Sequence, residues 1–373
     1  MTTVVQRIAT LLRAEGHDAT VVAPRYPYPT RGESRRDPDP DELRIPSVAL
    51  PVYPDIRLAL PHFRDIARFF DAARPDVVHV HTEGALGLAG RRYALQRQLP
   101  LVTTFHTNFP QYSRHYGVGL LEPLVWRWLQ WFHRPAQLTF TPGEGVRDEL
   151  VRRGIGRAAV WGRGVDTQFF HPARRDASWR RWLAGGENTP IVLHVGRLAR
   201  EKNLDVLIDA WLLAHETLGE RALFVVAGEG PLARRIEARL PFVRLLGFLP
   251  RHDLAKIYAS ADLCVFPSHT ETCGLVALEA MASGIPVIAA DAGGFRESVR
   301  SGVSGMLVAP HDPRAYADAV TTLIQDAPQR LAFGAAAREH VLTRDVAREN
   351  VELLELYSAL AGLTERRTSP CAA

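Results

Sequence analysis

The sequence predicts an α/β fold built from two doubly wound, Rossmann-like domains. Short apolar segments alternate with helical segments in two successive series, which is typical of βαβ units. The length of 373 residues exceeds what one hydrophobic core usually organises, so two domains are expected. With 46% apolar and 23% charged residues, the composition indicates neither a disordered chain nor a coiled coil.

The amino terminus is predicted to start within a helix. Its apolar residues recur at helical spacing, at Val4, Val5, Ile8, Leu11 and Leu12. The first strand of an open parallel sheet normally lies mid-sheet, and the loop after it faces the ligand. We therefore expect the first domain to lack its first strand, through either a wrongly assigned start codon or a real truncation.

Two series of apolar segments define the two domains. The first series is predicted at residues 18–24, 76–81, 101–106 and 136–142, with a Pro-rich charged loop at residues 30–46. The second series is predicted at residues 190–196, 222–228, 242–248, 262–267 and 286–291. The polar, proline-containing segment His171–Asp176 separates the series and is interpreted as the linker. Residues 1–172 are therefore assigned to the first domain and residues 177–345 to the second.

Charge, cysteine content and hydropathy argue against several classes of protein. The net charge of +4 comes without the concentrated basic stripe of a nucleic-acid-binding protein, so no nucleic-acid partner is expected. Cys264, Cys273 and Cys371 show neither zinc-ligand spacing nor a disulfide framework, which predicts reduced thiols. The chain has no run of 18 apolar residues and no signal-peptide pattern at its amino terminus, which predicts a cytoplasmic location.

The segment Glu271–Gly294 carries the strongest indication of function. Glu271 lies in the loop after a predicted strand, and Glu279 lies in a helix that begins near Gly274. The N–H groups at the start of that helix can hold a diphosphate, while the two carboxylates can accept hydrogen bonds from hydroxyl groups. The arrangement fits a sugar nucleotide. The alternative is two unrelated acids, one in a loop and one on a solvated helix face.

Arg197 and Lys202 flank the loop after the first strand of the second series. Two cations there can neutralise a diphosphate leaving group. A solvated pair is the alternative, although cations are disfavoured at a helix start unless an anion binds there. The segment Gly228–Ala233 formally matches the dinucleotide fingerprint, but the next strand ends without the acid that the fingerprint requires.

Five ordered blocks, together with Glu271–Gly294, resemble the retaining glycosyltransferases of family 4, which have the GT-B fold. The blocks are residues 161–172, 194–211, 225–232, 245–268 and 301–308. The resemblance implies two Rossmann-like domains facing across a cleft, with a last helix, residues 346–363, that packs back on the first domain. It also implies transfer of a hexose from a nucleoside diphosphate sugar to a hydroxyl group of a lipid or glycan acceptor.

The resemblance further implies roles for residues of this chain. Glu271 would orient the sugar, Arg197 and Lys202 would stabilise the departing diphosphate, and His106 would contact the sugar from the end of a strand. A packed or capping histidine is the alternative for His106. The implied donor-binding residues are Gly228, Gly230, Gly247, Phe248, Leu249, Gly274, Leu275, Val276 and Glu279, the last of them on the ribose. The implied acceptor-side residues are Tyr112, Arg114, His115 and Tyr116.

No metal ion or other cofactor is expected, and the nucleotide sugar serves as co-substrate. His79 and His81 share one face of a strand and could join His106, but no carboxylates complete a ligand set. Asp37 and Asp39 form the Asp-x-Asp spelling that metal-dependent GT-A transferases use. They lie in a Pro-rich polar loop and not at a strand end, which favours a solvated turn.

Residues 119–134 interleave tryptophans with arginines. Such a helix could lie in a bilayer interface, with its aromatic rings at headgroup depth, which would place the protein peripherally at the inner face of the membrane. The alternative is an amphipathic helix packed against the first sheet.

Three segments point to a subfamily. Residues 81–87, 106–117 and 161–166 most resemble the GDP-mannose-dependent α-mannosyltransferases and the sulfolipid-type glycolipid synthases of family 4. Two other functions stay open. An NDP-sugar epimerase of the same fold would need further acid/base residues and no acceptor. An inactive, amino-terminally truncated nucleotide-sugar-binding protein would bind the donor without turnover.

Overall fold

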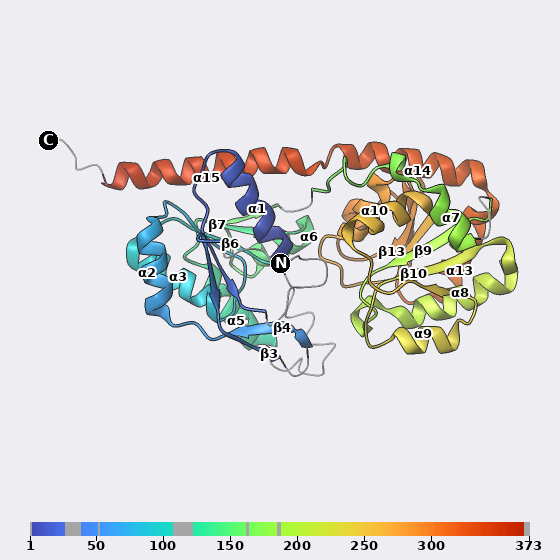
Figure 1. Cartoon of the computed structure of the whole chain (residues 1–373), viewed down its shortest axis with the longest axis horizontal. Helices are drawn as coiled ribbons and strands as arrows, with labels where there is room; N and C mark the ends of the chain where they lie inside the picture. Colours follow the sequence, from blue (N-terminus) through green and yellow to red (C-terminus); the bar gives the residue numbers. More distant parts are fainter. Residues whose placement is uncertain are drawn as a thin grey trace. The chain divides into compact units, whose positions relative to one another are not determined.

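The protein forms two compact α/β units in the computed structural model (Figure 1). The structure describes residues 2–26, 39–50, 53–106, 122–161, 164–184 and 188–368. The first unit comprises Met1–Gly162 and Glu349–Ala373, and the second comprises Arg163–Arg348. Parallel strands alternate with helices in both units, so the predicted fold class is confirmed.

The main sheet of the first unit has four parallel strands in the order β5, β6, β7, β8. The strands are β5 (Val78–Val80), β6 (Leu101–Thr104), β7 (Leu138–Thr141) and β8 (Ala158–Val160). Helices α2 (Phe63–Ala73), α3 (Ala85–Arg97), α5 (Glu122–His133) and α6 (Glu144–Arg152) alternate with them along the chain. The strands are mostly buried, as expected when helices cover a parallel sheet.

The two ends of the chain pack against this sheet. Helix α1 (Thr2–Ala14) contributes Ile8, and α15 (Val346–Thr368) contributes Leu353 and Leu360, to a buried cluster with Val102 and Trp161. The helical spacing of the apolar residues in α1 accounts for its part in this contact. From Glu349 onward the last helix therefore belongs to the first unit.

Four further strands of the first unit form two smaller sheets. Strand β1 (Val21–Pro24) pairs in parallel with β2 (Glu42–Ile45), and β3 (Ser47–Leu50) pairs antiparallel with β4 (Tyr53–Ala59). Among the described strands none bridges β1 to β5, so the parallel strands of this unit are divided between two sheets. Sequence patterns did not predict β2, β3 or β4, because these segments are short, Pro46 and Pro51 flank them, and Pro54 lies within β4.

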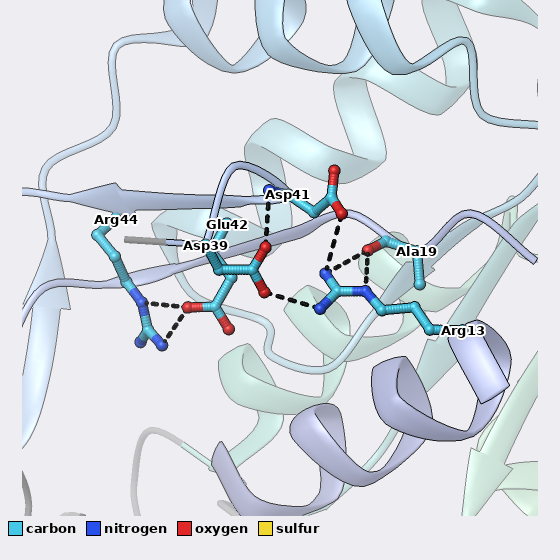
Figure 2. A network of polar contacts seen from close by, with 6 residues as sticks. All are labelled: Arg13, Ala19, Asp39, Asp41, Glu42 and Arg44. Atoms are coloured by element: carbon cyan, nitrogen blue, oxygen red, sulfur yellow. Dashed lines mark hydrogen bonds and ion pairs between the residues drawn. The ribbon is translucent and has the colours of Figure 1, made fainter. Parts of the chain in front are cut away.

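A polar network holds α1 to the segment that enters β2 (Figure 2). Arg13 donates to Asp39 Oδ2 at 2.7 Å and to the carbonyl oxygen of Ala19 at 2.7 Å. The N–H of Asp41 donates to Asp39 Oδ1 at 2.9 Å, and this bond, together with Arg13, lowers the pKa of Asp39. Asp39 therefore stabilises a turn, while Asp37 lies outside the described residues.

The second unit contains one six-stranded parallel sheet with the order β11, β10, β9, β12, β13, β14. The strands are β9 (Ile191–Val195), β10 (Leu223–Ala227), β11 (Arg244–Leu245), β12 (Leu263–Phe266), β13 (Val287–Ala290) and β14 (Gly305–Val308). The helices are α7 (Ala177–Ala184), α8 (Leu204–Leu218), α9 (Ala233–Arg239), α10 (Arg251–Ser260), α11 (Leu275–Ala282), α12 (Phe295–Ser298), α13 (Pro313–Gln325) and α14 (Ala327–Leu342).

Both faces of this sheet are covered. Leu193 of β9 enters one buried cluster and its neighbour Val192 enters the other, because successive side chains of a strand point to opposite faces. The strand order reverses between β9 and β12. Open α/β sheets bind ligands at such a switch point, beyond the carboxyl ends of the strands.

The boundary between the units lies before the predicted linker. The segment His171–Asp176 belongs to the second unit, which begins at Arg163 and ends at Arg348. Phe170 is buried in the core of that unit, and the N–H of Asp176 donates to Ser260 Oγ at 3.0 Å. The structure differs from the prediction because tertiary contacts anchor this polar, proline-containing segment, and composition does not reveal such contacts.

Candidate active site

Two loops of the second unit meet at the switch point of its sheet. The loop after β9 carries Arg197 and Lys202, and the loop after the neighbouring strand β12 carries Glu271. Asn203 ties the loops together, since its Nδ2 donates to the carbonyl oxygens of Pro267 at 3.2 Å and of Pro310 at 2.8 Å. Strand order thus brings together side chains that are far apart in the sequence.

Lys202 and Glu271 form an ion pair across this junction. Lys202 Nζ donates to Glu271 Oε1, and the two side chains are 20% and 17% exposed. The pair is part-buried but still reaches solvent, so each partner can turn to a ligand, the ammonium group to a phosphate oxygen and the carboxylate to sugar hydroxyls. The resemblance assigned the two residues to opposite ends of a sugar diphosphate, and the structure brings them into direct contact.

Glu201 is a buried acid that sequence patterns did not single out. Its side chain is 2% exposed, and its Oε1 lies 2.6 Å from Nη2 of the far more exposed Arg197. Its carbonyl oxygen accepts hydrogen bonds from Ser268 Oγ at 3.2 Å and Thr270 Oγ1 at 3.0 Å. Glu201 therefore anchors both the guanidinium group and the loop after β12. Its place beside Lys202 in a matching block was the only signal in the sequence.

Close backbone contacts require the glycines of the loop after β10. A Cβ on Gly228 would lie 1.8 Å from the carbonyl oxygen of Gly196, and a Cβ on Gly230 would lie 2.4 Å from that of Leu198. The N–H of Gly228 also donates to the carbonyl oxygen of Gly247 at 2.8 Å. These contacts hold the loop after β10 against the loop after β9.

The other predicted donor residues lie before α10 and at the start of α11. Phe248 is exposed, and Leu249 packs partly buried against the core. Gly274 has a φ of 71°, which favours glycine, and directly precedes α11. Leu275 and Val276 form the first turn, which has no side-chain cap, so its N–H groups remain available to an anion.

Glu279 lies on α11 with its carboxyl group beside the hydroxyl of Tyr258. Burial raises the pKa of Glu279 to about 7, outweighing the lowering effects of the Tyr258 hydroxyl and of Arg251. Near neutral pH this carboxyl is therefore close to half protonated. Hydroxyl donors of a ligand would favour its charged form, because hydrogen bonds to a carboxylate stabilise the charge.

His106 of the first unit lies two residues after β6, the strand that pairs with β5. Its Nε2 lies 3.1 Å from Nδ1 of His81. Burial lowers the pKa of His106 to about 4, so the ring is neutral at pH 7. The predicted acceptor-side residues Tyr112, Arg114, His115 and Tyr116 lie outside the described residues, and their roles stay predictions.

The contacts of His79 argue against a metal site at the histidines. Its Nδ1 lies 2.5 Å from the hydroxyl of Tyr357, and its Nε2 lies 2.6 Å from Thr104 Oγ1, so both ring nitrogens are engaged. Over the described ranges, no group of three or more His, Cys, Asp or Glu residues is arranged to hold a metal ion.

Helix α5, within the predicted segment 119–134, buries one face and exposes another. Trp126, Leu129 and Phe132 are buried, as in an amphipathic helix packed on a sheet. Trp128 and Trp131 are 39% and 49% exposed, with ring centroids 5.1 Å apart. None of the described helices has the length and apolar character needed to cross a membrane.

The fold and the site define an α/β protein with a cation and a carboxylate paired at the switch point of a parallel sheet. Residues 1–169 match the family described as Glycosyltransferase Family 4, and residues 177–340 match the one described as Glycosyl transferases group 1. The chain is 35% identical to a GDP-mannose-dependent alpha-mannosyltransferase of Mycobacterium tuberculosis, over 97% of this chain and 92% of that protein. The chain belongs to the family 4 glycosyltransferases, as its sequence blocks predicted.

Two further similar proteins are a sequence relative and a solved structure that shares the fold. The chain is 33% identical to the sulfoquinovosyl transferase SQD2 of Arabidopsis thaliana, over 87% of this chain and 63% of that protein. The sucrose-phosphate synthase of Thermosynechococcus elongatus shares the fold, with a TM-score of 0.74 at 22% identity over 97% of this chain and 93% of that one. The relatives are transferases, which confirms the predicted enzyme class and does not favour the epimerase alternative.

Proposed function

We propose that this glycosyltransferase is a retaining mannosyltransferase that takes mannose from GDP-mannose and passes it to a hydroxyl group of a lipid or glycan. The observation that carries the proposal is the Lys202–Glu271 pair, which offers a cation and a carboxylate to a sugar diphosphate at the switch point. The mannosyltransferase relative supports GDP-mannose over other nucleotide sugars.

In the proposed reaction the acceptor oxygen attacks the anomeric carbon on the face from which the diphosphate leaves. The bond from that carbon to the phosphate oxygen breaks as the glycosidic bond forms, and the acceptor proton passes to the leaving phosphate oxygen. Arg197 and Lys202 stabilise the charge that develops on the diphosphate. Glu271 orients the sugar and His106 contacts it, so that catalysis rests on positioning and on charge stabilisation.

No divalent metal or further cofactor is needed in this proposal. The cations of the loop after β9 and the N–H groups at the start of α11 can together neutralise the diphosphate. Transfer should therefore survive chelation by EDTA. Loss of activity with EDTA and its rescue by manganese would contradict this part of the proposal.

We also propose that the exposed face of α5 contacts an anionic lipid surface. This face consists of Leu124, Trp128 and Trp131 with the exposed Arg127 and Arg134. Aromatic rings favour headgroup depth, and arginines favour anionic headgroups. A membrane-borne acceptor would then lie near the first unit.

Binding and transfer measured on the same protein test the proposed donor. Thermal shifts with GDP, UDP, GDP-mannose and UDP-glucose should be largest for GDP-mannose, and labelled mannose should pass to a lipid or glycan extract. Stronger stabilisation by UDP-glucose would contradict the proposal that GDP-mannose is the donor. Stabilisation by GDP-mannose without turnover would instead support the inactive nucleotide-sugar-binding protein.

Variants of the proposed site, compared with control variants elsewhere in the second unit, test whether transfer depends on Lys202 and Glu271. Lys202→Met and Glu271→Gln should abolish most transfer without lowering the melting temperature. Arg239→Met and Asp209→Asn remove an exposed ion pair of 3.2 Å between α9 and α8 and should leave transfer unchanged. Equal activity in the two sets of variants would refute the assignment of the site.

A further inference from the structure

Three imidazole rings lie in a row beside the ends of β5 and β6 in the first unit. The ring centroids of His79 and His81 lie 3.9 Å apart, and those of His81 and His106 lie 5.4 Å apart at an interplanar angle of 21°. His79 is held by Tyr357 of α15 and by Thr104 of β6. One end of the row is thus fixed by two hydrogen bonds, and the other end is His106.

The contact between His81 and His106 has only two proton arrangements. Burial lowers the pKa of His106 to about 4 and that of His81 well below its usual value, and the neighbouring rings lower the latter further. Both rings are therefore neutral near pH 7, each with one N–H and one lone pair. Across the 3.1 Å between His81 Nδ1 and His106 Nε2, one nitrogen donates and the other accepts.

The direction of this hydrogen bond decides whether the other ring nitrogen of His106, Nδ1, is a donor or an acceptor. If Nε2 accepts the proton of His81, then Nδ1 of His106 carries its own proton and is a donor. If Nε2 donates, Nδ1 is an acceptor. Among the described residues none forms a hydrogen bond with Nδ1 of His106, and in the proposal this nitrogen is the one that meets the ligand.

We propose that His81 is a positioning residue that holds the ring plane of His106 and, through this hydrogen bond, ties the tautomer of His106 to its own. The proposal rests on the proposed contact between His106 and the transferred sugar. His79, stacked on His81 and bonded to Tyr357 and Thr104, keeps the His81 ring in place. A neutral imidazole locked in one tautomer presents one kind of hydrogen-bonding group to a sugar hydroxyl, and a ring that exchanges tautomers presents it only part of the time.

Two substitutions separate the hydrogen bond from the packing. In His81→Asn the side-chain amide can occupy the place of Nδ1 and keep the bond, whereas His81→Phe keeps a stacked ring without any nitrogen. We expect kcat of His81→Asn to stay within about 3-fold of the wild type, and kcat of His81→Phe to fall about 10- to 100-fold with an unchanged KM for the donor. His17→Phe, at an exposed position of the same unit, is the control. Unchanged kcat in His81→Phe, or an equal loss in both variants, would overturn the proposal.

Nitrogen NMR of the imidazole rings tests the tautomer without using activity. In the wild-type protein His106, assigned with His106→Asn, should show one predominant tautomer, and in His81→Phe it should show a mixture. A mixture in the wild type would overturn the proposal even if the variants failed to fold. If instead His106→Asn were fully active while the tautomer was locked, the proposed sugar contact of His106 would fail and the positioning by His81 would stand.

Discussion

At the scale of single residues, the Lys202–Glu271 pair determines what donor binding must do. Without a ligand the two side chains neutralise each other. In the proposed binding mode a sugar diphosphate separates them, giving a phosphate oxygen to Lys202 and sugar hydroxyls to Glu271. The two side chains are only 20% and 17% exposed, so separating them costs more than separating a surface pair, and the contacts with the donor must offset that cost. A nucleoside diphosphate without its sugar would occupy Lys202 but leave Glu271 without a partner, and we therefore expect the site to favour the intact donor over the product.

The first prediction is that Glu271→Gln weakens this preference. The amide cannot hold Lys202 in an ion pair, so the affinity for GDP should stay the same or rise. Turnover should fall about 30- to 1000-fold, because a charged contact in the transition state is worth about 2–4 kcal/mol. Calorimetric titration with GDP and GDP-mannose, together with initial rates, checks both parts, with Asp209→Asn as the control. Turnover near the wild-type level would contradict the role of Glu271.

The second prediction concerns the pH dependence that Glu279 causes. Its pKa is about 7 in the folded chain and 4.5 for an ordinary glutamate, so the folded state binds more protons between these values. The free energy of unfolding should therefore fall as pH rises from about 4.5 to 7, by up to about 3 kcal/mol from this group. Glu279→Gln should remove that loss. The melting temperature of the variant, relative to that of the wild type, should therefore rise from pH 5 to pH 8.

Donor binding should show the opposite trend at this residue. Ribose hydroxyls donate to the charged carboxylate, so binding of GDP to the wild type should tighten as pH rises through 7. In Glu279→Gln this dependence should disappear. A constant difference in melting temperature between the two proteins across this pH range would contradict the raised pKa.

At the scale of elements, strand order decides which loops can share a site. β10 and β11 lie between β9 and β12 in the sequence, yet β9 and β12 are neighbours in the sheet, and their loops carry the ion pair. Short glycine contacts then hold the loop after β10 against the loop after β9. Packing likewise divides the residues of helix α5. One face is buried in the first unit, and the other face stays exposed.

The third prediction tests the exposed face of α5. Trp128→Ser combined with Trp131→Ser should lower binding to vesicles that contain anionic lipid, because two aromatic rings would be lost from the headgroup region. Trp182→Ser, on α7 of the second unit and 61% exposed, should have no such effect. Co-sedimentation with anionic and with zwitterionic vesicles measures the difference. Equal binding of all the proteins to anionic vesicles would exclude α5 as the contact.

At the scale of the whole molecule, the two units differ in how their sheets are built. The second unit has one continuous six-stranded sheet between two large buried clusters. The first unit divides its described strands among three sheets, and its buried clusters are smaller. The free energy of the local unfolding that exposes an amide to exchange depends on the hydrogen bonds and buried contacts around it. The second unit should therefore open less readily than the first.

The fourth prediction follows from that difference. In hydrogen exchange read by mass spectrometry, β9, β10, β12 and β13 should be among the slowest segments, and β1–β4 should exchange faster. GDP should further slow the loop 197–202 and the start of α11, because a ligand that binds only the native state stabilises it. Uniform exchange of both units would contradict the comparison. GDP protection confined to the first unit would contradict the proposed nucleotide site.

The sequence by itself determined the fold class and the main candidate residues. Alternating apolar and helical segments predict parallel sheets, since period and length are local properties of the chain. Arg197, Lys202, Glu271 and Glu279 could be named because each lies in a contiguous block that resembles family 4. Boundaries and short strands such as β2–β4 were less accessible, because tertiary contacts and not local composition decide them.

Only the tertiary structure decided how these residues act on one another. It pairs Lys202 with Glu271, buries Glu201 beneath Arg197, and joins His81 to His106 across neighbouring strands. Each of these contacts depends on strand order and register, which place distant segments at one sheet edge. The raised pKa of Glu279 depends likewise on how α10 and α11 enclose its carboxyl group. A sequence pattern reports spacing along one element, whereas distance and burial across elements arise only when the sheet has formed.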